Sequence, residues 1–216
     1  MPLPRLAVTL RSGDEMLQAD LYGELPAQRA AVLCHGQNWD AAGWREIAPR
    51  LAARGVPALA VNLRGYDGST GTTDEFAPPA PWSPVTDLGA AKDFLRERGV
   101  GEIALVGCSM GGHAALASSF AGDAECVVSV SAPVVAVSDD MSRRVAGRTL
   151  YLCASDDSSG ATPHVLRSFA ALRVPKTLLL FGGSEHSRGM FFAPYGEDAL
   201  EALIAFIAKG LEPGAA

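Results

Sequence analysis

Residues 102–120 read EIALVGCSMGGHAALASSF, and the pentapeptide Gly107-Cys108-Ser109-Met110-Gly111 lies near their centre. The apolar run before the pentapeptide predicts a strand, and the alanine-rich run 112–120 after it predicts a helix. A Gly-x-Ser-x-Gly sequence between a strand and a helix is typical of the nucleophile elbow, a tight turn that lifts one serine hydroxyl clear of a sheet. The turn needs small neighbours, and Gly107 and Gly111 supply them. The sequence therefore predicts an exposed, nucleophilic Ser109.

Strand-like runs recur along the rest of the chain. Arg5–Arg11 and Glu15–Tyr22 flank a Ser-Gly-Asp turn and predict an N-terminal antiparallel hairpin. The later runs are nearly continuous in Val, Leu, Ile and Ala, as expected for parallel strands that helices cover on both faces. These runs are Ala30–His35, Pro57–Asn62, Glu102–Gly107, Glu125–Ser131, Thr149–Cys153 and Lys176–Phe181. We expect an α/β fold with a mostly parallel eight-stranded sheet and helices on both of its faces.

Helical periodicity fills the segments between these strands. Pro49 interrupts the first helical pattern. Ser83-Pro84 and Thr162-Pro163 each read as an N-cap followed by the first residue of a helix. The stretch Arg64–Ser83 is rich in Gly, Thr and Pro and has the length of a functional loop. The chain shows no internal repeat and no second domain, so we expect a single α/β domain over residues 1–216.

Composition and charge exclude several classes of partner. A net charge of −6 and a pI near 5.2 argue against binding to nucleic acid or to an anionic membrane. The sequence has no membrane-spanning run and no signal peptide pattern at its start. The cysteines fall in or beside strand-like runs, as expected for buried, reduced thiols of a cytoplasmic protein. None has metal-site spacing to another Cys or His, and we expect neither a metal nor another cofactor.

A nucleophilic serine needs a general base within hydrogen-bond reach. His186 is the best candidate because it follows the last predicted strand on a glycine-rich loop, where it can reach the carboxyl edge of the sheet. The alternative is that His186 is an ordinary surface histidine. Among the other histidines, His35 suits a structural role near the loop after the first parallel strand, His113 suits packing, and His164 suits an exposed helical turn.

The base in turn needs a carboxylate to fix its tautomer. Asp156 and Asp157 follow the strand Thr149–Cys153, which is the strand before the histidine strand. We expect one of them to orient His186 and prefer Asp157, with Asp156 as the alternative. Both could instead be turn residues, for which Asp is a common choice. Thr162-Pro163 already serves as the start of the next helix, so these aspartates are not needed there.

The developing oxyanion needs backbone donors. The N–H of Met110 is one candidate, because it follows the serine at the positive end of a helix. The second candidate is the N–H of Gln37, in the loop after the first parallel strand, where Gly36 lets the backbone turn.

In chain order, these segments resemble an α/β-hydrolase, and the resemblance covers nearly the whole chain. It rests on the His35-Gly36 strand end, the segment Asn62–Ser69, the elbow, an Asp after the seventh strand and the late His186. Size and layout are similar to small bacterial members related to dienelactone hydrolases and carboxylesterases. The dienelactone subgroup has cysteine at the elbow where Ser109 stands here, so its particular substrate is not implied. The family's Gly-x-x-Asp before the acid reads Ala-Ser-Asp-Asp here, an alignment that supports Asp157.

The resemblance implies a serine hydrolase that cleaves a small-to-medium carboxylic ester, thioester or lactone through an acyl-enzyme. The alternatives are acyl transfer on the same fold and a non-catalytic ligand-binding protein. Residues 132–148 leave little room for the helical cap of many family members, which implies an open cleft and a preference for short acyl chains. Candidates to line this cleft, with ordinary packing as the alternative, are Trp39, Trp82, Phe191 and Phe192.

Overall fold

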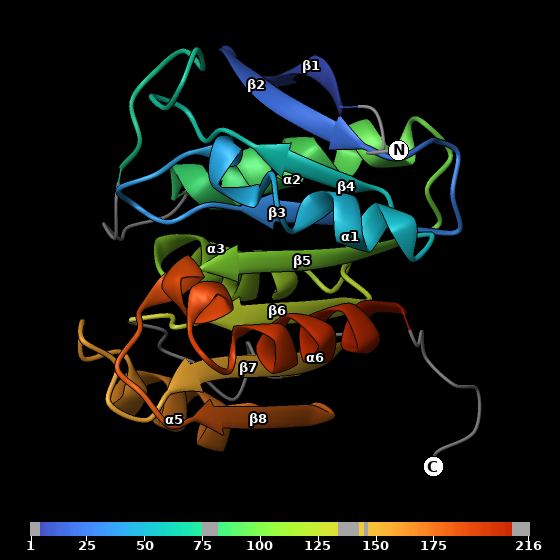
Figure 1. Cartoon of the computed structure of the whole chain (residues 1–216). Coiled ribbons are helices and arrows are strands. Elements are labelled where there is room, and N and C mark those ends of the chain that lie inside the picture. Colours follow the sequence, from blue (N-terminus) through green and yellow to red (C-terminus); the bar gives the residue numbers. More distant parts are fainter. Residues whose placement is uncertain (1–4, 75–81, 134–142, 145–146, 209–216) are drawn as a thin grey trace.

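An eight-stranded sheet forms the centre of the protein (Figure 1). The structure is a computed structural model that describes residues 5–74, 82–133, 143–144 and 147–208. The strands are β1 Arg5–Ser12, β2 Glu15–Tyr22, β3 Arg29–Cys34, β4 Ala58–Val61, β5 Glu102–Cys108, β6 Cys126–Val130, β7 Arg148–Ala154 and β8 Lys176–Phe181. Their order in the sheet is β1-β2-β4-β3-β5-β6-β7-β8. The β1–β2 and β2–β4 pairs are antiparallel and the other pairs are parallel, which confirms the predicted fold.

Helices cover both faces of this sheet. They are η1 Ala41–Trp44, α1 Ala48–Ala53, α2 Ser83–Arg96, α3 Met110–Ser119, α5 Thr162–Ala171, η2 Ser187–Phe192 and α6 Gly196–Ala208. Helices α1 and α6 lie on one face, and α2, α3 and α5 lie on the other (Figure 1). Each face has its own hydrophobic cluster against the sheet, one containing Leu88 and Leu116 and the other containing Leu51 and Leu203. The continuous apolar strand runs of the sequence are therefore explained by burial on two sides.

The helix starts differ by one residue from the prediction. Ser83 is the first residue of α2 and not its N-cap, which is Trp82. The Ser83 hydroxyl is bonded to Asp74, whose carboxylate also accepts the Ser83 N–H at 2.8 Å. Thr162 likewise begins α5, and its hydroxyl donates to the Ala154 carbonyl at 2.9 Å. Both hydroxyls thus bond to partners outside their helices.

Two short elements stand where the sequence predicted one interrupted helix. The first is η1, which ends at Trp44, and the second is α1, which has Pro49 in its first turn. A proline fits there because the first N–H groups of a helix have no partner within it. The buried residues Trp44 and Leu51 still face the same cluster, so the predicted apolar stripe survives the break.

The predictions about a cap and a single domain stay predictions. Residues 134–142 and 145–146 of the proposed cap position, and residues 75–81 of the long loop, lie outside the described residues. Within the described ranges, every helix is too short or too polar to cross a bilayer.

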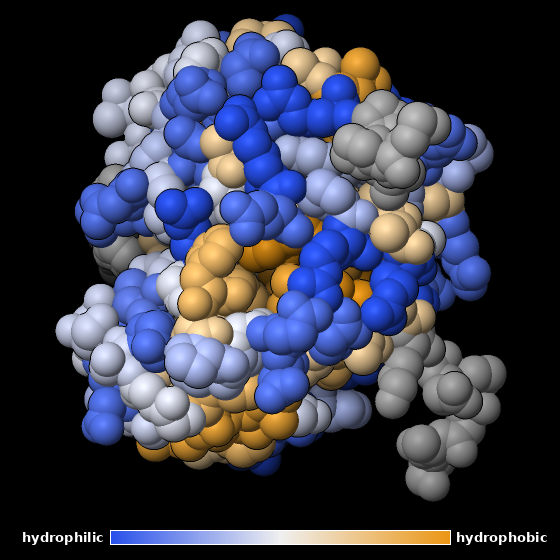
Figure 2. All heavy atoms as spheres, in the orientation of Figure 1, coloured by the Kyte–Doolittle hydropathy of each residue, from blue (hydrophilic) through white to orange (hydrophobic). Residues whose placement is uncertain are grey.

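β8 is the edge strand that precedes His186. None of its residues is buried, and Leu180 is 46% exposed. Figure 2 shows hydrophobic side chains gathered at this edge of the sheet. In contrast, β6 is buried throughout and β5 has only its first residue partly exposed. The strand before Ser109 is therefore fixed by the core, whereas the loop after β8 depends on contacts of its own.

Candidate active site

Ser109 lies at the turn between β5 and α3. Its φ is 53° and its ψ is −118°, a conformation rare for a residue with a side chain, and its N–H donates to the Val130 carbonyl at 2.8 Å. A Cβ atom at Gly107 would overlap the Gly111 carbonyl, and one at Gly111 would overlap the Cys34 carbonyl. The two glycines are therefore required by close backbone approach, as the sequence pattern predicts.

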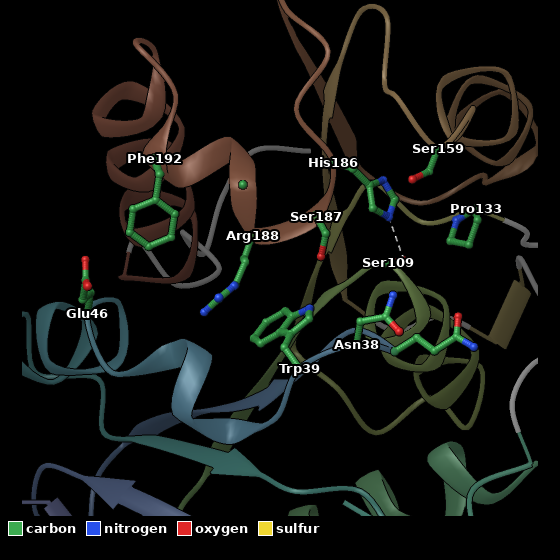
Figure 3. A pocket seen from close by; sticks show the side chains of 12 residues that line it. Asn38, Trp39, Glu46, Ser109, Pro133, Ser159, His186, Ser187, Arg188 and Phe192 are labelled. Atoms are coloured by element: carbon green, nitrogen blue, oxygen red, sulfur yellow. Dashed lines mark hydrogen bonds between the residues drawn. The ribbon is translucent and has the colours of Figure 1, made fainter.

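Three side chains far apart in the chain meet at the carboxyl edge of the sheet, and Figure 3 shows two of them, Ser109 and His186. His186 Nε2 lies 2.9 Å from Ser109 Oγ, and His186 Nδ1 lies 2.9 Å from both carboxylate oxygens of Asp157. The Asp157 side chain is fully buried, whereas Asp156 is exposed. The structure thus places Asp157, the preferred candidate, against the imidazole.

Backbone hydrogen bonds join the loop of His186 to the loop of Asp157. The N–H of Asp156 donates to the Gly183 carbonyl at 3.0 Å, and the N–H of Ser158 donates to the Ser184 carbonyl at 2.9 Å. The loop after β8 is also tied to the segment before α6, since Tyr195 donates its hydroxyl proton to Glu185 at 2.8 Å. These bonds hold His186 although its strand lies at an exposed edge.

The Asp157 carboxylate has several donors besides the imidazole. The Ser159 N–H donates to it at 2.9 Å and the Ala161 N–H at 3.4 Å. The Ser131 hydroxyl donates to Met190 Sδ at 3.4 Å and also acts to lower the pKa of Asp157. Burial acts to raise the pKa of Asp157, but these hydrogen bonds, with that from His186 the strongest, outweigh burial and hold the pKa below its usual 3.8. Asp157 therefore stays charged, and its bonds to Ser159 and Ala161 also hold the turn that precedes α5.

Three serines with left-handed backbone surround the site. Ser109, Ser131 and Ser187 have φ values of 53°, 49° and 59°, and they are the non-glycine residues with positive φ in the described ranges. Ser109 is itself one of the three meeting residues, Ser131 acts on Asp157, and Ser187 directly follows His186. Such a conformation costs about 1–3 kcal/mol per residue and persists where the surroundings enforce it. Ser131 and Ser187 were not predictable as site residues, because a serine that follows a strand or a histidine carries no sequence signal of its backbone conformation.

The loop after β3 is held by His35. Leu63 donates its N–H to Nε2 at 3.1 Å, so the ring proton is on Nδ1, which donates to the Gly36 carbonyl at 2.8 Å. Burial lowers the pKa of His35 to about 4, so the ring is neutral near pH 7. The predicted structural role of His35 is confirmed, and it fixes the backbone next to Gln37, whose carbonyl accepts the Tyr66 hydroxyl at 2.8 Å.

A cavity of about 740 Å³ opens above Ser109. It is lined by Gln37, Asn38, Trp39, Glu46, Ser109, Pro133, Ser159, His186, Ser187, Arg188, Gly189 and Phe192. Trp39 and the exposed Phe192 are thus in the lining, as expected. Trp82 and Phe191 are not: Trp82 packs edge-on against His113 with ring centroids 4.6 Å apart, and Phe191 lies in the cluster beneath α6. Both belong to the core because their segments turn these rings inward.

The remaining candidates have structural surroundings. His113 is half-buried in α3, and burial lowers its pKa to about 4. His164 is partly buried, not exposed, and its Nδ1 lies 2.9 Å from Arg167. Cys108 is buried and free, as are the other cysteines. In the parts of the chain that the structure describes, no three His, Cys, Asp or Glu side chains cluster as a metal site requires.

The family model described as the alpha/beta hydrolase family matches residues 31–213. No curated protein sequence gives a match. Among solved structures, an esterase from Pyrococcus furiosus aligns with a TM-score of 0.78 at 13% identity, over 96% of this chain and 93% of its own. An α/β hydrolase from a Penicillium species gives 0.79 at 16% identity, over 97% and 99%. A Butyrivibrio proteoclasticus protein with bound ferulic acid gives 0.77 at 14% identity, over 95% and 99%.

Proposed function

Since this chain belongs to the alpha/beta hydrolase family, we propose that it is a serine hydrolase that cleaves carboxylic esters with Ser109, His186 and Asp157 as its catalytic triad. The observation that carries the proposal is the 2.9 Å separation of His186 Nε2 from Ser109 Oγ. This distance lies within the range over which a base removes a proton from a nucleophile.

In the first half of the reaction, Ser109 Oγ attacks the ester carbonyl and gives its proton to His186 Nε2. Asp157, hydrogen-bonded to Nδ1 through both oxygens at 2.9 Å, holds the Nδ1–H tautomer and stabilises the imidazolium that forms. His186 then donates the proton to the departing alcohol, which leaves an acyl group on Ser109.

The tetrahedral intermediate needs donors for its negative oxygen. Met110 is the first residue of α3, where N–H groups have no acceptor within the helix. We assign its N–H and that of Gln37, which lines the same cavity, as the oxyanion donors. Loss of one such donor typically costs about 3 kcal/mol of transition-state stabilisation.

In the second half, His186 removes a proton from water, which attacks the acyl-enzyme and releases the carboxylic acid. The cavity of about 740 Å³ suits a small-to-medium ester, and we propose short acyl chains as the preferred class. The related fold of the Pyrococcus furiosus esterase supports an ester as the substrate. The cysteines are buried and free, which favours a reducing compartment, and we propose the cytoplasm.

A fluorophosphonate probe tests the proposal, since it reacts with an activated serine. We expect labelling of the wild-type protein and none of Ser109→Ala, with hydrolysis of p-nitrophenyl butyrate lost in parallel. Ser159→Ala is the matched control, because Ser159 is an exposed serine in the same cavity and its loss should leave labelling unchanged. A folded wild-type protein that neither reacts with the probe nor cleaves esters would contradict the assignment.

A further inference from the structure

One wall of the cavity presents donors that the protein does not use. Trp39, Ser187 and Arg188 form this wall, between the loop after β3 and η2 (Figure 3). The Ser187 hydroxyl is buried, and no described oxygen or nitrogen accepts its proton; its neighbour is the Cys108 thiol, whose pKa it acts to lower against the effect of burial. Trp39 Nε1 and the Arg188 guanidinium also have no hydrogen-bond acceptor among the described residues.

The Arg188 guanidinium is held in place without being neutralised. Its central carbon lies 5.3 Å from the centre of the Trp39 ring, a cation–π arrangement. A Cβ atom at Gly43 would overlap the Trp39 ring and lie 2.9 Å from Arg188 Nη1, so both groups rest against the Gly43 backbone. The side chain is thus oriented by an aromatic face, while its N–H groups keep their capacity to bind an acceptor.

The charges that face Arg188 do not satisfy it. Glu46 is the carboxylate of the lining, and it makes no ion pair with Arg188 within 4.0 Å. Figure 3 shows Arg188 between Glu46 and the Ser109–His186 pair. An unpaired cation therefore lines the same cavity as the nucleophile, and the Glu46 carboxylate in that lining disfavours ligands with more than one negative charge.

We propose that Trp39, Ser187 and Arg188 form an anion subsite, and that the substrates are esters carrying one carboxylate besides the bond that is cleaved. The inference rests on the proposed ester hydrolysis and names its substrate class. A guanidinium binds a carboxylate through two parallel N–H···O bonds. The indole N–H and the serine hydroxyl supply further donors on the same wall.

Matched ester pairs test the subsite on either side of the scissile bond. p-Nitrophenyl hydrogen glutarate and its methyl ester differ by one charge on the acyl side, and 3-carboxy-4-nitrophenyl butyrate and 4-nitrophenyl butyrate differ on the alcohol side. We expect kcat/KM to favour the anionic member of one pair by about tenfold. Arg188→Gln should abolish the preference for the anionic member, and added salt should weaken that preference.

Arg167→Gln is the matched control. Arg167 lies on α5 outside the cavity lining, so the substitution removes the same charge from the protein and should keep the preference. Trp39→Phe retains the aromatic face and removes the N–H, and we expect a smaller loss, about threefold.

Binding to the Ser109→Ala protein separates this inference from the proposed function. Calorimetry should show tighter binding of the anionic member of the favoured pair, and Arg188→Gln in the same background should remove the difference. Ester hydrolysis without any anionic preference, or a preference that survives Arg188→Gln, would overturn the subsite and leave the hydrolase assignment standing. Preferential binding to a protein that cleaves no ester would support the subsite and overturn the hydrolase.

Discussion

Among individual side chains, Ser131 acts on the triad through Asp157. It is fully buried after β6, its hydroxyl donates to Met190 Sδ at 3.4 Å, and it acts to lower the pKa of the carboxylate that orients His186. It keeps a left-handed backbone, φ 49°, that glycine would adopt with less strain. A serine in such a position is explained by its hydroxyl, and we regard Ser131 as a positioning residue for Asp157.

Two substitutions distinguish the effect of the Ser131 hydroxyl from the effect of its backbone conformation. Ser131→Ala and Ser131→Gly both remove the hydroxyl that stabilises the charged form of Asp157, and we expect each to lower kcat by about tenfold, roughly 1.4 kcal/mol, with little change in KM. Gly relieves the left-handed strain and Ala does not, so the Gly variant should be the more stable of the two by about 1 kcal/mol. Steady-state kinetics and urea denaturation measure the two effects.

Ser168→Ala is the control for loss of a buried hydroxyl. Ser168 lies 2.9 Å from the Tyr151 hydroxyl, away from the cavity lining, so its removal should cost stability without lowering kcat. If Ser131→Gly restored the kcat that Ser131→Ala loses, the positioning role of the hydroxyl would be wrong.

Among the helices and strands, α3 lies in close backbone contact with the sheet. Its first turn lies directly against the end of β3, because Gly111 brings its Cα close to the carbonyls of Cys34 and His35. This contact places the N-terminus of α3 beside the loop that carries Gln37. The ends of β3 and β5 and the start of α3 therefore meet at the elbow, and the absence of a side chain at Gly111 allows α3 to lie close to β3.

Opposite effects are expected from two Gly→Ala substitutions. Gly111→Ala should destabilise the protein by about 3 kcal/mol, since the added methyl group meets backbone that has no room to move. Gly89→Ala should stabilise it by about 0.5–1 kcal/mol, because Gly89 lies inside α2 with open space around its Cα. Urea denaturation measures both. Equal effects of the two substitutions would contradict this account of the elbow.

Every strand was predictable from sequence to within a residue or so at each end. Burial on two faces demands uninterrupted apolar runs, and such runs are visible without a structure. The first residue of α2 was not predictable in the same way. Ser83 has the side chain of an N-cap, but its bond to Asp74 is a contact between segments, and local sequence carries no record of it.

In the candidate site too, residues placed by strand ends were predictable from the sequence, and residues placed by contacts between segments were not. Ser109, Asp157 and His186 were predictable because each follows a strand at the same edge of the sheet. Trp82 and Phe191 were misplaced, since an aromatic residue beside a loop can turn toward a cavity or toward the core. Ser187 and Arg188 were missed, because their role depends on meeting Trp39 across the cavity.

Across the protein as a whole, buried histidines couple stability to pH. His35 has its pKa lowered by burial from 6.5 to about 4, and its neutral ring accepts the Leu63 N–H. Burial also lowers the pKa of His113 to about 4. Between pH 6.5 and about pH 4, these histidines bind protons in the unfolded chain but not in the folded protein. The free energy of unfolding therefore falls as the pH falls.

We expect the wild-type protein to lose about 2–3 kcal/mol of stability per buried histidine between pH 7 and pH 4.5. His35→Asn should be less stable at pH 7 but should lose less on acidification, because one of the proton-binding groups is gone from its unfolded state. Urea denaturation at several pH values gives both slopes. Equal slopes for the two proteins would show that His35 does not contribute to the acid lability.

The serines with positive φ lower the stability of the protein and supply hydroxyl groups to the site. Glycine at positions 131 and 187 would relax the backbone, and each relaxation would remove a hydroxyl that the triad or the anion subsite is proposed to use. A library of variants selected only for survival at high temperature would therefore accumulate glycine beside the reacting groups. The most thermostable variants of that library would have the lowest activity. Substitutions that raise stability without loss of activity would have to lie away from the cavity.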